Sequence, residues 1–233
     1  MSNNCIPVKT PEEWQKLIAD PNKQWKEGFS AWETAHCWLD ADGFPSEITT
    51  LFASSPASVF RNIEMLIGIP EYKVLLPPRS RHPSQNDLFV LARDGNGNLI
   101  SITIEAKASE SFGKTIEKWM VPQSHGKSIR YKFLVDKLGL TGKDLRHIKY
   151  QFLHRLASAV IEAERFHAKY AMMFVHSFST ENKGLADYNM FLNIFGVKGD
   201  VGQLVHLKNH AGIDYYLGWA QGVLRKPPSY EAT

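Results

Sequence analysis

Apolar residues recur along the chain at two spacings, which predict helices in some segments and strands in others. Four helices are expected in the first part of the chain, at residues 11–19, 30–43, 45–52 and 58–67. A long helix is expected at 145–167, with apolar residues over most of its circumference. A polar stripe at helical spacing remains on it. The stripe comprises Gln151, His154, Arg155, Ser158 and Glu162.

Strands are predicted between these helices. A short strand, 74–76, is bounded by prolines, and two longer strands, DLFVLARD and LISITIEAKA, follow it. The turn that joins these two, RDGNGN, contains Asp-Gly and Asn-Gly, so the pair is expected to form a hairpin. A buried strand is predicted for YAMMFVHSF, a helix near 187–195, and two last strands for QLVHLK and DYYLGWAQG.

The order of these elements indicates a single domain with inserted and terminal segments added to it. We expect a helical extension at 1–29, a domain at 30–220 and a loose tail at 221–233. A basic helical insert, at about 111–143, interrupts the domain after the hairpin, with helices expected at 111–120 and 129–138. The fold class is therefore α/β, and a strand, the long helix and another strand follow one another at the centre of the domain.

Composition is that of a soluble globular protein. The 233 residues are 43% hydrophobic and 22% charged. No apolar run has transmembrane length, and the N-terminus does not have the pattern of a secretory signal. The two cysteines, Cys5 and Cys37, form neither a disulfide framework nor a zinc pattern, which favours the cytoplasm.

Charge is unevenly distributed. Residues 107–169 hold thirteen Lys and Arg against six Asp and Glu, a net +7, whereas the rest of the chain holds fourteen against eighteen, a net −4. A basic middle suits an anionic partner such as nucleic acid, and an uneven solvated surface is the alternative. Trp119 lies in the basic insert and can stack on a base, although packing against the protein is the favoured role.

Charged residues lie at the open ends of the predicted hairpin. Side chains alternate along a strand, so Glu105 and Lys107 share a face, and hairpin pairing brings Asp87 beside them. Two carboxylates can hold Mg²⁺, which polarises a phosphoryl oxygen and lowers the pKa of bound water, while the lysine orients that water or stabilises charge. A Glu–Lys pair on a solvated strand face is the alternative, but Asp87 directly precedes an apolar strand that tolerates an unpaired charge poorly.

These residues, Asn86-Asp87 and Glu105-Ala106-Lys107, resemble the motif of the PD-(D/E)XK nuclease superfamily, without the proline of its name. The element order also resembles the α, β, β, β, α, β core of that superfamily. The phrases PSQNDLFVLAR, YQFLHR and VHSFS are similar to an uncharacterised bacterial family within it. The resemblance spans about residues 30–220. It implies a restriction-endonuclease-like core, an αβββαβ mixed sheet flanked by helices, here with a helical insert and a small C-terminal addition.

The resemblance also implies roles for individual residues. Asp87, Glu105 and the carbonyl of Ala106 would be ligands of Mg²⁺ or Mn²⁺, and Lys107 would be the catalytic lysine. The superfamily often adds an acidic residue from its first core helix, for which the candidates are Glu33 and Glu64, with Glu64 closer in sequence to the strands. Gln151 resembles a glutamine that some members add near the site, and His154 follows it one helical turn later.

Three functions remain open from the sequence. The first is a metal-dependent nuclease, with DNA favoured over RNA and a homodimer possible, which requires Asp87, Glu105 and Lys107 to meet in one pocket. The second is an inactive protein of the same fold that binds nucleic acid or a protein partner, with Asp87 and Glu105 in internal ion pairs. The third is an unrelated α/β enzyme with a closed pocket for a small molecule.

Overall fold

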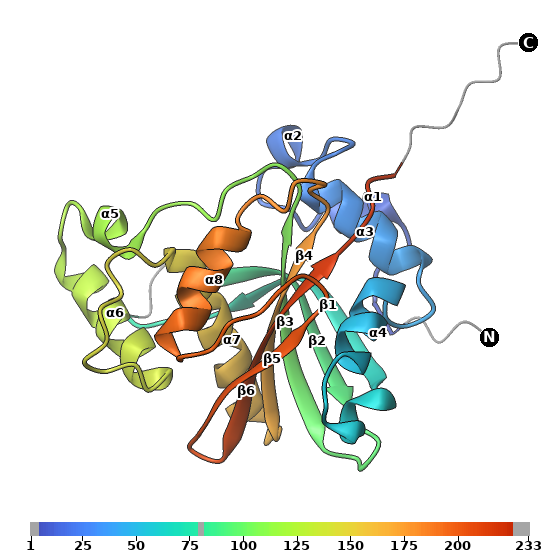
Figure 1. Cartoon of the computed structure of the whole chain (residues 1–233). Coiled ribbons are helices and arrows are strands. Elements are labelled where there is room, and N and C mark those ends of the chain that lie inside the picture. The colour runs from blue at the N-terminus through green and yellow to red at the C-terminus, as the bar shows by residue number, and fades with distance from the viewer. Residues whose placement is uncertain (1–4, 79–81, 226–233) are drawn as a thin grey trace, which may run out of the picture.

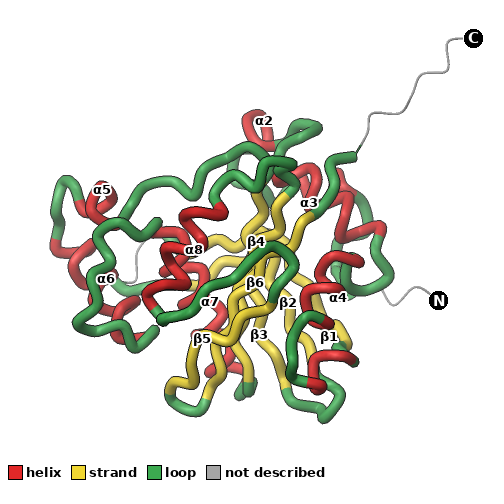
Figure 2. Tube along the Cα trace, in the orientation of Figure 1, coloured by secondary structure: helices red, strands yellow, loops and turns green. Residues whose placement is uncertain are grey.

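A single six-stranded sheet with helices on both faces makes up the fold of the computed structural model (Figures 1 and 2), which describes residues 5–78 and 82–225. The strands are β1 Glu64–Val74, β2 Ser84–Arg93, β3 Leu99–Lys107, β4 Tyr170–Ser177, β5 Leu204–His210 and β6 Ile213–Gln221. The helices are α1 Pro11–Gln15, α2 Pro21–Gln24, α3 Ser30–Asp40, α4 Ser46–Ala53, α5 Ile116–Met120, α6 His125–Lys137, α7 Tyr150–Phe166 and α8 Leu185–Ile194, with one 3-10 turn, η1 Ser58–Arg61.

The sheet is mixed, in the order β1-β2-β3-β4-β6-β5. β1, β2 and β3 form an antiparallel meander, β3 and β4 are parallel, β4 and β6 are parallel, and β5 returns antiparallel to β6. α7 makes the crossover between the parallel strands β3 and β4, while α5 and α6 are inserted before it. The expected α/β class is confirmed, and from β2 onward the elements follow in the expected order.

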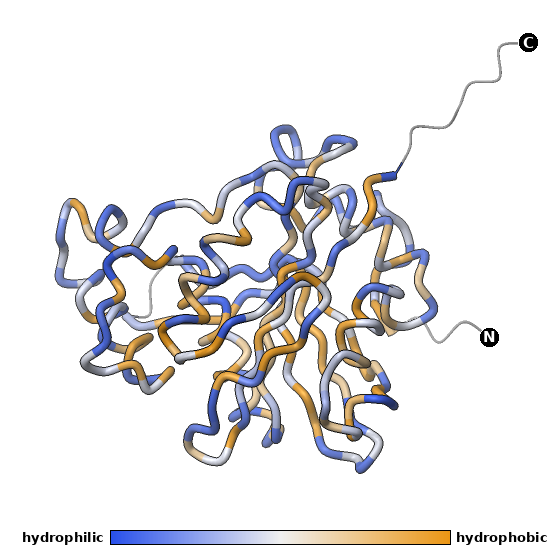
Figure 3. The backbone as a smooth tube through the Cα atoms, in the orientation of Figure 1, coloured by the Kyte–Doolittle hydropathy of each residue, from blue (hydrophilic) through white to orange (hydrophobic). Residues whose placement is uncertain are grey.

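Alternation along β3 separates two hydrophobic layers. Ile100, Ile102 and Ile104 belong to the cluster that packs under α1, α3 and α4, whereas the intervening Ser101 and Thr103 face α7. In Figure 3 the central strands are largely hydrophobic and the outer loops largely hydrophilic. Each fully buried Ile, Leu or Phe side chain contributes about 1.5–3 kcal/mol. Because Ile100, Ile102 and Ile104 are buried on one face of the sheet, Glu105 and Lys107 must lie on the other face, towards α7.

α7 lies along β3 because both elements offer matching polar atoms as well as apolar contacts. Ser101 Oγ donates to the Ala159 carbonyl at 2.8 Å, and Thr103 Oγ1 donates to the Arg155 carbonyl at 3.1 Å. The helix ends at His167, which adopts a left-handed conformation (φ 53°) and donates its N–H to carbonyls of the last turn. The first turn of α7 therefore lies over the end of β3 that carries Glu105 and Lys107.

The helix predicted at 58–67 is wrong. Residues 58–61 form only the 3-10 turn η1, and Glu64–Val74 is an edge strand of eleven residues paired along β2. The apolar residues that share a helical face can also pack on a strand, and pairing with β2 satisfies the backbone groups of both strands. The short strand predicted at 74–76 is also wrong, because β1 ends at Val74 and residues 75 and 76 lie beyond it.

Both terminal segments that were assigned outside the domain pack against it. Trp14 is 1% exposed and lies in the same hydrophobic cluster as Ile48 and Leu51, while Gly68 N–H donates to the Cys5 carbonyl at 3.1 Å. Arg225 N–H donates to Glu33 at 3.1 Å, so the chain is still attached to α3 there; residues 226–233 of the predicted tail lie outside the described residues. No helix in residues 5–78 and 82–225 is long and apolar enough to cross a membrane.

Candidate functional site

Three carboxylates form a row across neighbouring strands. The register that pairs Pro70 with Leu88 places Glu71 opposite Asp87, and the register that pairs Leu88 with Ile104 places Asp87 opposite Glu105. Directly opposed side chains lie about 4.5–5.5 Å apart at Cβ, and like charges there are destabilising. The row therefore needs positive charge from its surroundings.

A pocket of about 440 Å³ opens over this row. Asp87, Glu105 and Lys107 all line it, together with Glu71, so the convergence expected of the hairpin ends is observed. The opposite wall comes from the N-terminal segment, including Lys23 and the loop that leads into α3. The pocket is thus a recess between the sheet and the N-terminal helices.

Glu105 is the most heavily paired member of the row. Its carboxylate is 2% exposed, accepts from Lys107 Nζ and Arg155 Nε, and also accepts from Gln151 Nε2 at 3.0 Å. Burial alone would raise the pKa of Glu105, but the charges of Arg155 and Lys107 hold this pKa well below its usual range. Glu105 is therefore ionised, as the inactive alternative also requires.

Asp87 has a different environment. Its Oδ2 accepts the backbone N–H of Ala106 at 2.6 Å, and no ion pair joins it to any residue within the described ranges. Burial and the neighbouring Glu105 charge raise the pKa of Asp87 to about 7. Asp87 is thus a carboxylate without a dedicated cation, which departs from the fully ion-paired arrangement expected of an inactive site.

Glu71 was missed by the sequence analysis. Burial and the Asp87 charge raise the pKa of Glu71 to about 8, and Gln85 Nε2 donates to its Oε2 at 2.5 Å. Its φ of 54° is uncommon for a residue other than glycine, and such backbone conformations concentrate at functional sites. Nothing in the local sequence reveals this position, because it depends on the pairing of β1 with β2.

Arg155 was recognised as part of a polar stripe but not as a site residue. The residue is 7% exposed, and its guanidinium donates to Glu105 and, through Nη1, to Ser84 Oγ at 3.1 Å. His154 contacts the same Ser84 Oγ through Nδ1 at 2.8 Å, and it does not line the carboxylate pocket. Burial lowers the pKa of His154 well below its usual value, so the imidazole is neutral and supports Ser84 and Arg155.

Neither acidic residue proposed from the first core helix reaches the pocket. Glu64 begins β1 at the opposite end of the meander, where it pairs with Arg93 at 2.6 Å on the surface. Glu33 is on α3 and 1% exposed, but its oxygens accept the backbone N–H groups of Gly28 and Arg225. Glu71, from a strand rather than a helix, takes the position that these residues were expected to fill.

The chemistry of the donor set suits a divalent cation of the magnesium type, although the carboxylate oxygens of Glu71, Asp87 and Glu105 do not all come within 4.8 Å of one another. Three carboxylates supply oxygen ligands, and Mg²⁺ needs only one or two of them besides water. The raised pKa values of Asp87 and Glu71 are those of carboxylates that lack a compensating charge. Glu105 has its oxygens engaged by Lys107 and Arg155, but a carboxylate has about four acceptor positions and can accept a further partner.

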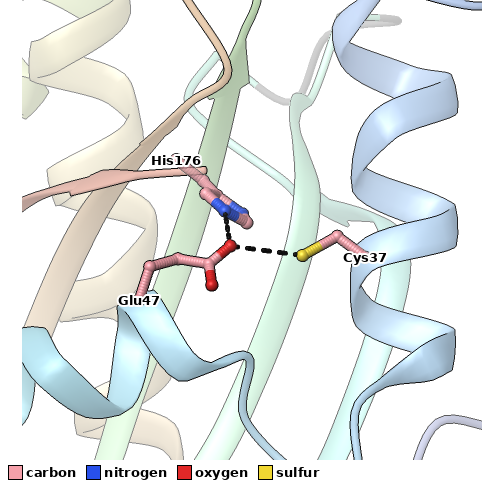
Figure 4. A group of neighbouring side chains, drawn as sticks. All are labelled: Cys37, Glu47 and His176. Atoms are coloured by element: carbon pink, nitrogen blue, oxygen red, sulfur yellow. Dashed lines mark hydrogen bonds and ion pairs between the residues drawn. The ribbon is translucent and has the colours of Figure 1, made fainter. Parts of the chain in front are cut away.

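A second cluster, on the other face of the sheet, joins Cys37, Glu47 and His176 (Figure 4). Trp38 Nε1 donates to His176 Nδ1 at 3.1 Å, which leaves the ring proton on Nε2, where it is donated to Glu47 Oε1 at 2.8 Å. Burial alone would raise the pKa of Glu47, but the hydrogen bond from His176 lowers it to about 2. A metal on Nε2 would put a proton on Nδ1 against the Trp38 N–H, so this cluster is hydrogen-bonded rather than built for a metal.

Fold and site together define an α/β protein with an acidic pocket at the edge of a mixed sheet. The chain belongs to a family described as a domain of unknown function (DUF6946), whose sequence model matches residues 7–224. The match includes the N-terminal segment that walls the pocket. Neither the comparison with curated proteins nor the comparison with solved structures gave a match.

Proposed function

We propose that this protein is a metal-dependent phosphodiesterase of the PD-(D/E)XK type that hydrolyses nucleic acid. The observation that carries the proposal is the row of Glu71, Asp87 and Glu105 across three strands, with Lys107 in the same pocket. Carboxylates with raised pKa values beside a lysine are typical of sites where a metal activates water. The antiparallel meander, the α7 crossover and the parallel β4 support a restriction-endonuclease-like core.

Each residue has a distinct part in this proposal. Glu71, Asp87 and Glu105 would hold Mg²⁺ or Mn²⁺, which polarises a phosphoryl oxygen and lowers the pKa of bound water. Lys107 orients the attacking water or stabilises the negative charge on the phosphate. Arg155 and Gln151 fix the Glu105 carboxylate, and the Ala106 N–H fixes Asp87. The Ala106 carbonyl is a further candidate ligand from the same turn of chain.

An inactive nuclease-fold protein that binds nucleic acid or a protein partner is the second candidate. The observation that favours it is the pairing of Glu105 with both Lys107 and Arg155, which gives this carboxylate its charge balance from the protein itself. In that case, the raised pKa values of Asp87 and Glu71 would mean that these groups are protonated near neutral pH. The two candidates differ in whether the protein cleaves nucleic acid, with a divalent cation and Lys107 required for the cleavage.

A cleavage assay with Mg²⁺ or Mn²⁺ on single- and double-stranded DNA and RNA tests the proposal. We expect metal-dependent cleavage that falls by about 100-fold or more in Lys107→Ala, the magnitude of a lost proton-transfer or charge-stabilising group. The matched control is Lys198→Ala, an exposed lysine between α8 and β5 that lines neither pocket, and this variant should keep metal-dependent cleavage. Cleavage that persists in Lys107→Ala or with chelator, or no cleavage of any substrate, would contradict the catalytic proposal.

A further inference from the structure

A second recess lies beside the carboxylate pocket, between α6 and the chain that follows β1. Its volume is about 340 Å³. It is lined by Pro78, His82, Trp119, Ser124, Gly126, Lys127 and Arg130. One aromatic ring with basic side chains around a small recess is the composition of a site for a flat anionic ligand.

The ring of Trp119 is held in a fixed orientation. It stacks on Tyr150 with centroids 4.0 Å apart and planes 7° apart, and Tyr150 in turn contacts the His154 ring at 4.6 Å. Lys127 Nζ lies 5.8 Å from the Trp119 centroid and donates to the Pro122 carbonyl at 2.9 Å. Trp119 is half-buried, so part of its ring packs against the protein and part stays accessible beside Lys127.

The two recesses are joined through the first turn of α7. Tyr150 contacts Trp119 in the second recess, while the next residue, Gln151, donates to Glu105 in the carboxylate pocket at 3.0 Å. Consecutive residues of an α-helix differ by about 1.5 Å along its axis and by about 100° around it, so these two side chains point to neighbouring sides of α7, and the two recesses flank its first turn. Stacked nucleotides of one strand are about 3.4 Å apart. A strand that passes along this turn of α7 can therefore contact both recesses.

The surface around the second recess is basic. Residues 114–149 hold nine Lys and Arg against three Asp and Glu, a net +6. Some of these cations are neutralised by Asp or Glu, but Lys114 and Lys118 are exposed and have no ion pair within the part of the chain that the structure describes. Such lysines attract a phosphate backbone without reading its sequence.

We propose that the Trp119 recess binds an unpaired base of single-stranded nucleic acid, next to the phosphate held at the carboxylates; this rests on the proposed function. The base stacks at the Trp119–Tyr150 pair, and Lys127 moves from the ring to the adjoining phosphate. A duplex keeps its base faces stacked on each other, so it cannot offer one to Trp119. The wall formed by the N-terminal segment, including Phe29 and Lys23, also makes the carboxylate pocket a recess that suits one strand.

Binding of a labelled oligothymidylate to the full chain, by fluorescence anisotropy in EDTA, tests this without any catalysis. We expect Trp119→Ala to weaken single-strand binding by roughly 5- to 150-fold, the effect of removing one base–aromatic stack. Trp119→Phe retains most of the affinity and reports that the recess still folds. Trp32→Ala removes another half-buried tryptophan, on α3, and leaves binding unchanged. The same strand paired with oligoadenylate is expected to bind more weakly.

The outcomes separate this inference from the proposed function. Trp119-dependent binding of the single strand without any metal-dependent cleavage would support the recess and contradict the nuclease. Metal-dependent cleavage with strand binding that is the same in Trp119→Ala and wild type would support the nuclease and overturn the recess. Tighter binding of the duplex, or no binding of either probe, would also overturn it.

Discussion

Asp87, Glu71 and Glu105 are neighbours in one row, yet their protonation is driven in opposite directions. Lys107 and Arg155 hold Glu105 in the ionised form, whereas burial and the adjacent negative charge raise the pKa of Asp87 to about 7 and that of Glu71 to about 8. The unequal treatment follows from geometry, because both cations reach Glu105 and neither forms an ion pair with Asp87 or Glu71. Two of the three carboxylates are left poised for an additional cation.

The raised pKa values predict how stability depends on pH. Above pH 4.5 the unfolded chain releases protons that folded Asp87 and Glu71 retain, so this stability is fully present at low pH and is lost as pH rises through 7 to 8. We expect the thermal midpoint of metal-free protein to fall between pH 6.5 and 8.5, and to fall less in Asp87→Asn. The lowered pKa of His154 has the opposite effect on stability, because it reduces stability as the pH falls below 6.5.

Thermal unfolding followed by circular dichroism across that pH window measures the effect. Asp144→Asn is the control, because Asp144 is fully exposed and its pKa is lowered by Arg146, outside the window. Added Mn²⁺ should flatten the wild-type profile, since it binds the deprotonated carboxylates. A profile that is identical in wild type and Asp87→Asn would refute the assignment of the shifted groups.

At the scale of elements, the sequence predicts the hairpin and its consequences well. The turn predicted for RDGNGN forms: Asp94 accepts hydrogen bonds from the backbone N–H groups of Asn96 and Asn98, and Gly97 has a φ of 83°. The register of the hairpin, which this turn sets, then brings Asp87 beside Glu105. α7, β4 and the final hairpin also follow from their apolar patterns, because long periodic segments leave few alternatives.

The remaining part of the site depends on long-range pairing. Glu71 joins it only because β1 pairs with β2 in one register, and the local pattern at 58–67 suggested a helix instead. Arg155 was visible four residues after Gln151 in the polar stripe, a spacing that places both on one side of α7. Its partner was not predicted, because the approach of α7 to β3 is set by tertiary packing.

Arg155 links α7 to the row of carboxylates, and its removal should expose that role. Truncating one partner of a buried ion pair costs about 3–5 kcal/mol, so Arg155→Met should lower the thermal midpoint of metal-free protein markedly. Mn²⁺ should raise the midpoint more in this variant than in wild type, because it replaces the lost counter-charge of Glu105. Differential scanning calorimetry with and without Mn²⁺ measures both effects.

The matched control for this experiment is Lys132→Met on α6. Its partner Asp136 lies four residues later on an exposed helix face, where such pairs contribute only about 0.3–0.5 kcal/mol. We expect this control to change neither the midpoint nor the response to Mn²⁺. An Arg155→Met protein as stable as wild type, or one with no greater response to Mn²⁺, would contradict the role assigned to Arg155.

At the scale of the whole molecule, the N-terminal helices and the basic insert lie on opposite sides of the sheet (Figure 1), and the N-terminal segment and the chain that leads into the insert meet at the carboxylate pocket. The family match over residues 7–224 includes all of these parts, in agreement with the burial of Trp14 in the hydrophobic cluster under α1, α3 and α4. Acidic residues line the carboxylate pocket, while Lys and Arg predominate in the 114–149 segment. This separation suits a polyanion that is held by the basic surface and cut at a cation in the recess.

Binding of Mn²⁺ measured by isothermal titration calorimetry is the most direct test of the central claim. We expect saturable binding by wild type, loss of binding in Asp87→Asn and markedly weaker binding in Glu71→Gln. Cys37→Ala is the control, because the Cys37–Glu47–His176 cluster is the other group of potential ligands, and it should bind Mn²⁺ as wild type does. No heat of binding by wild type, or equal binding by wild type and Asp87→Asn, would contradict a metal-holding role for the row of carboxylates.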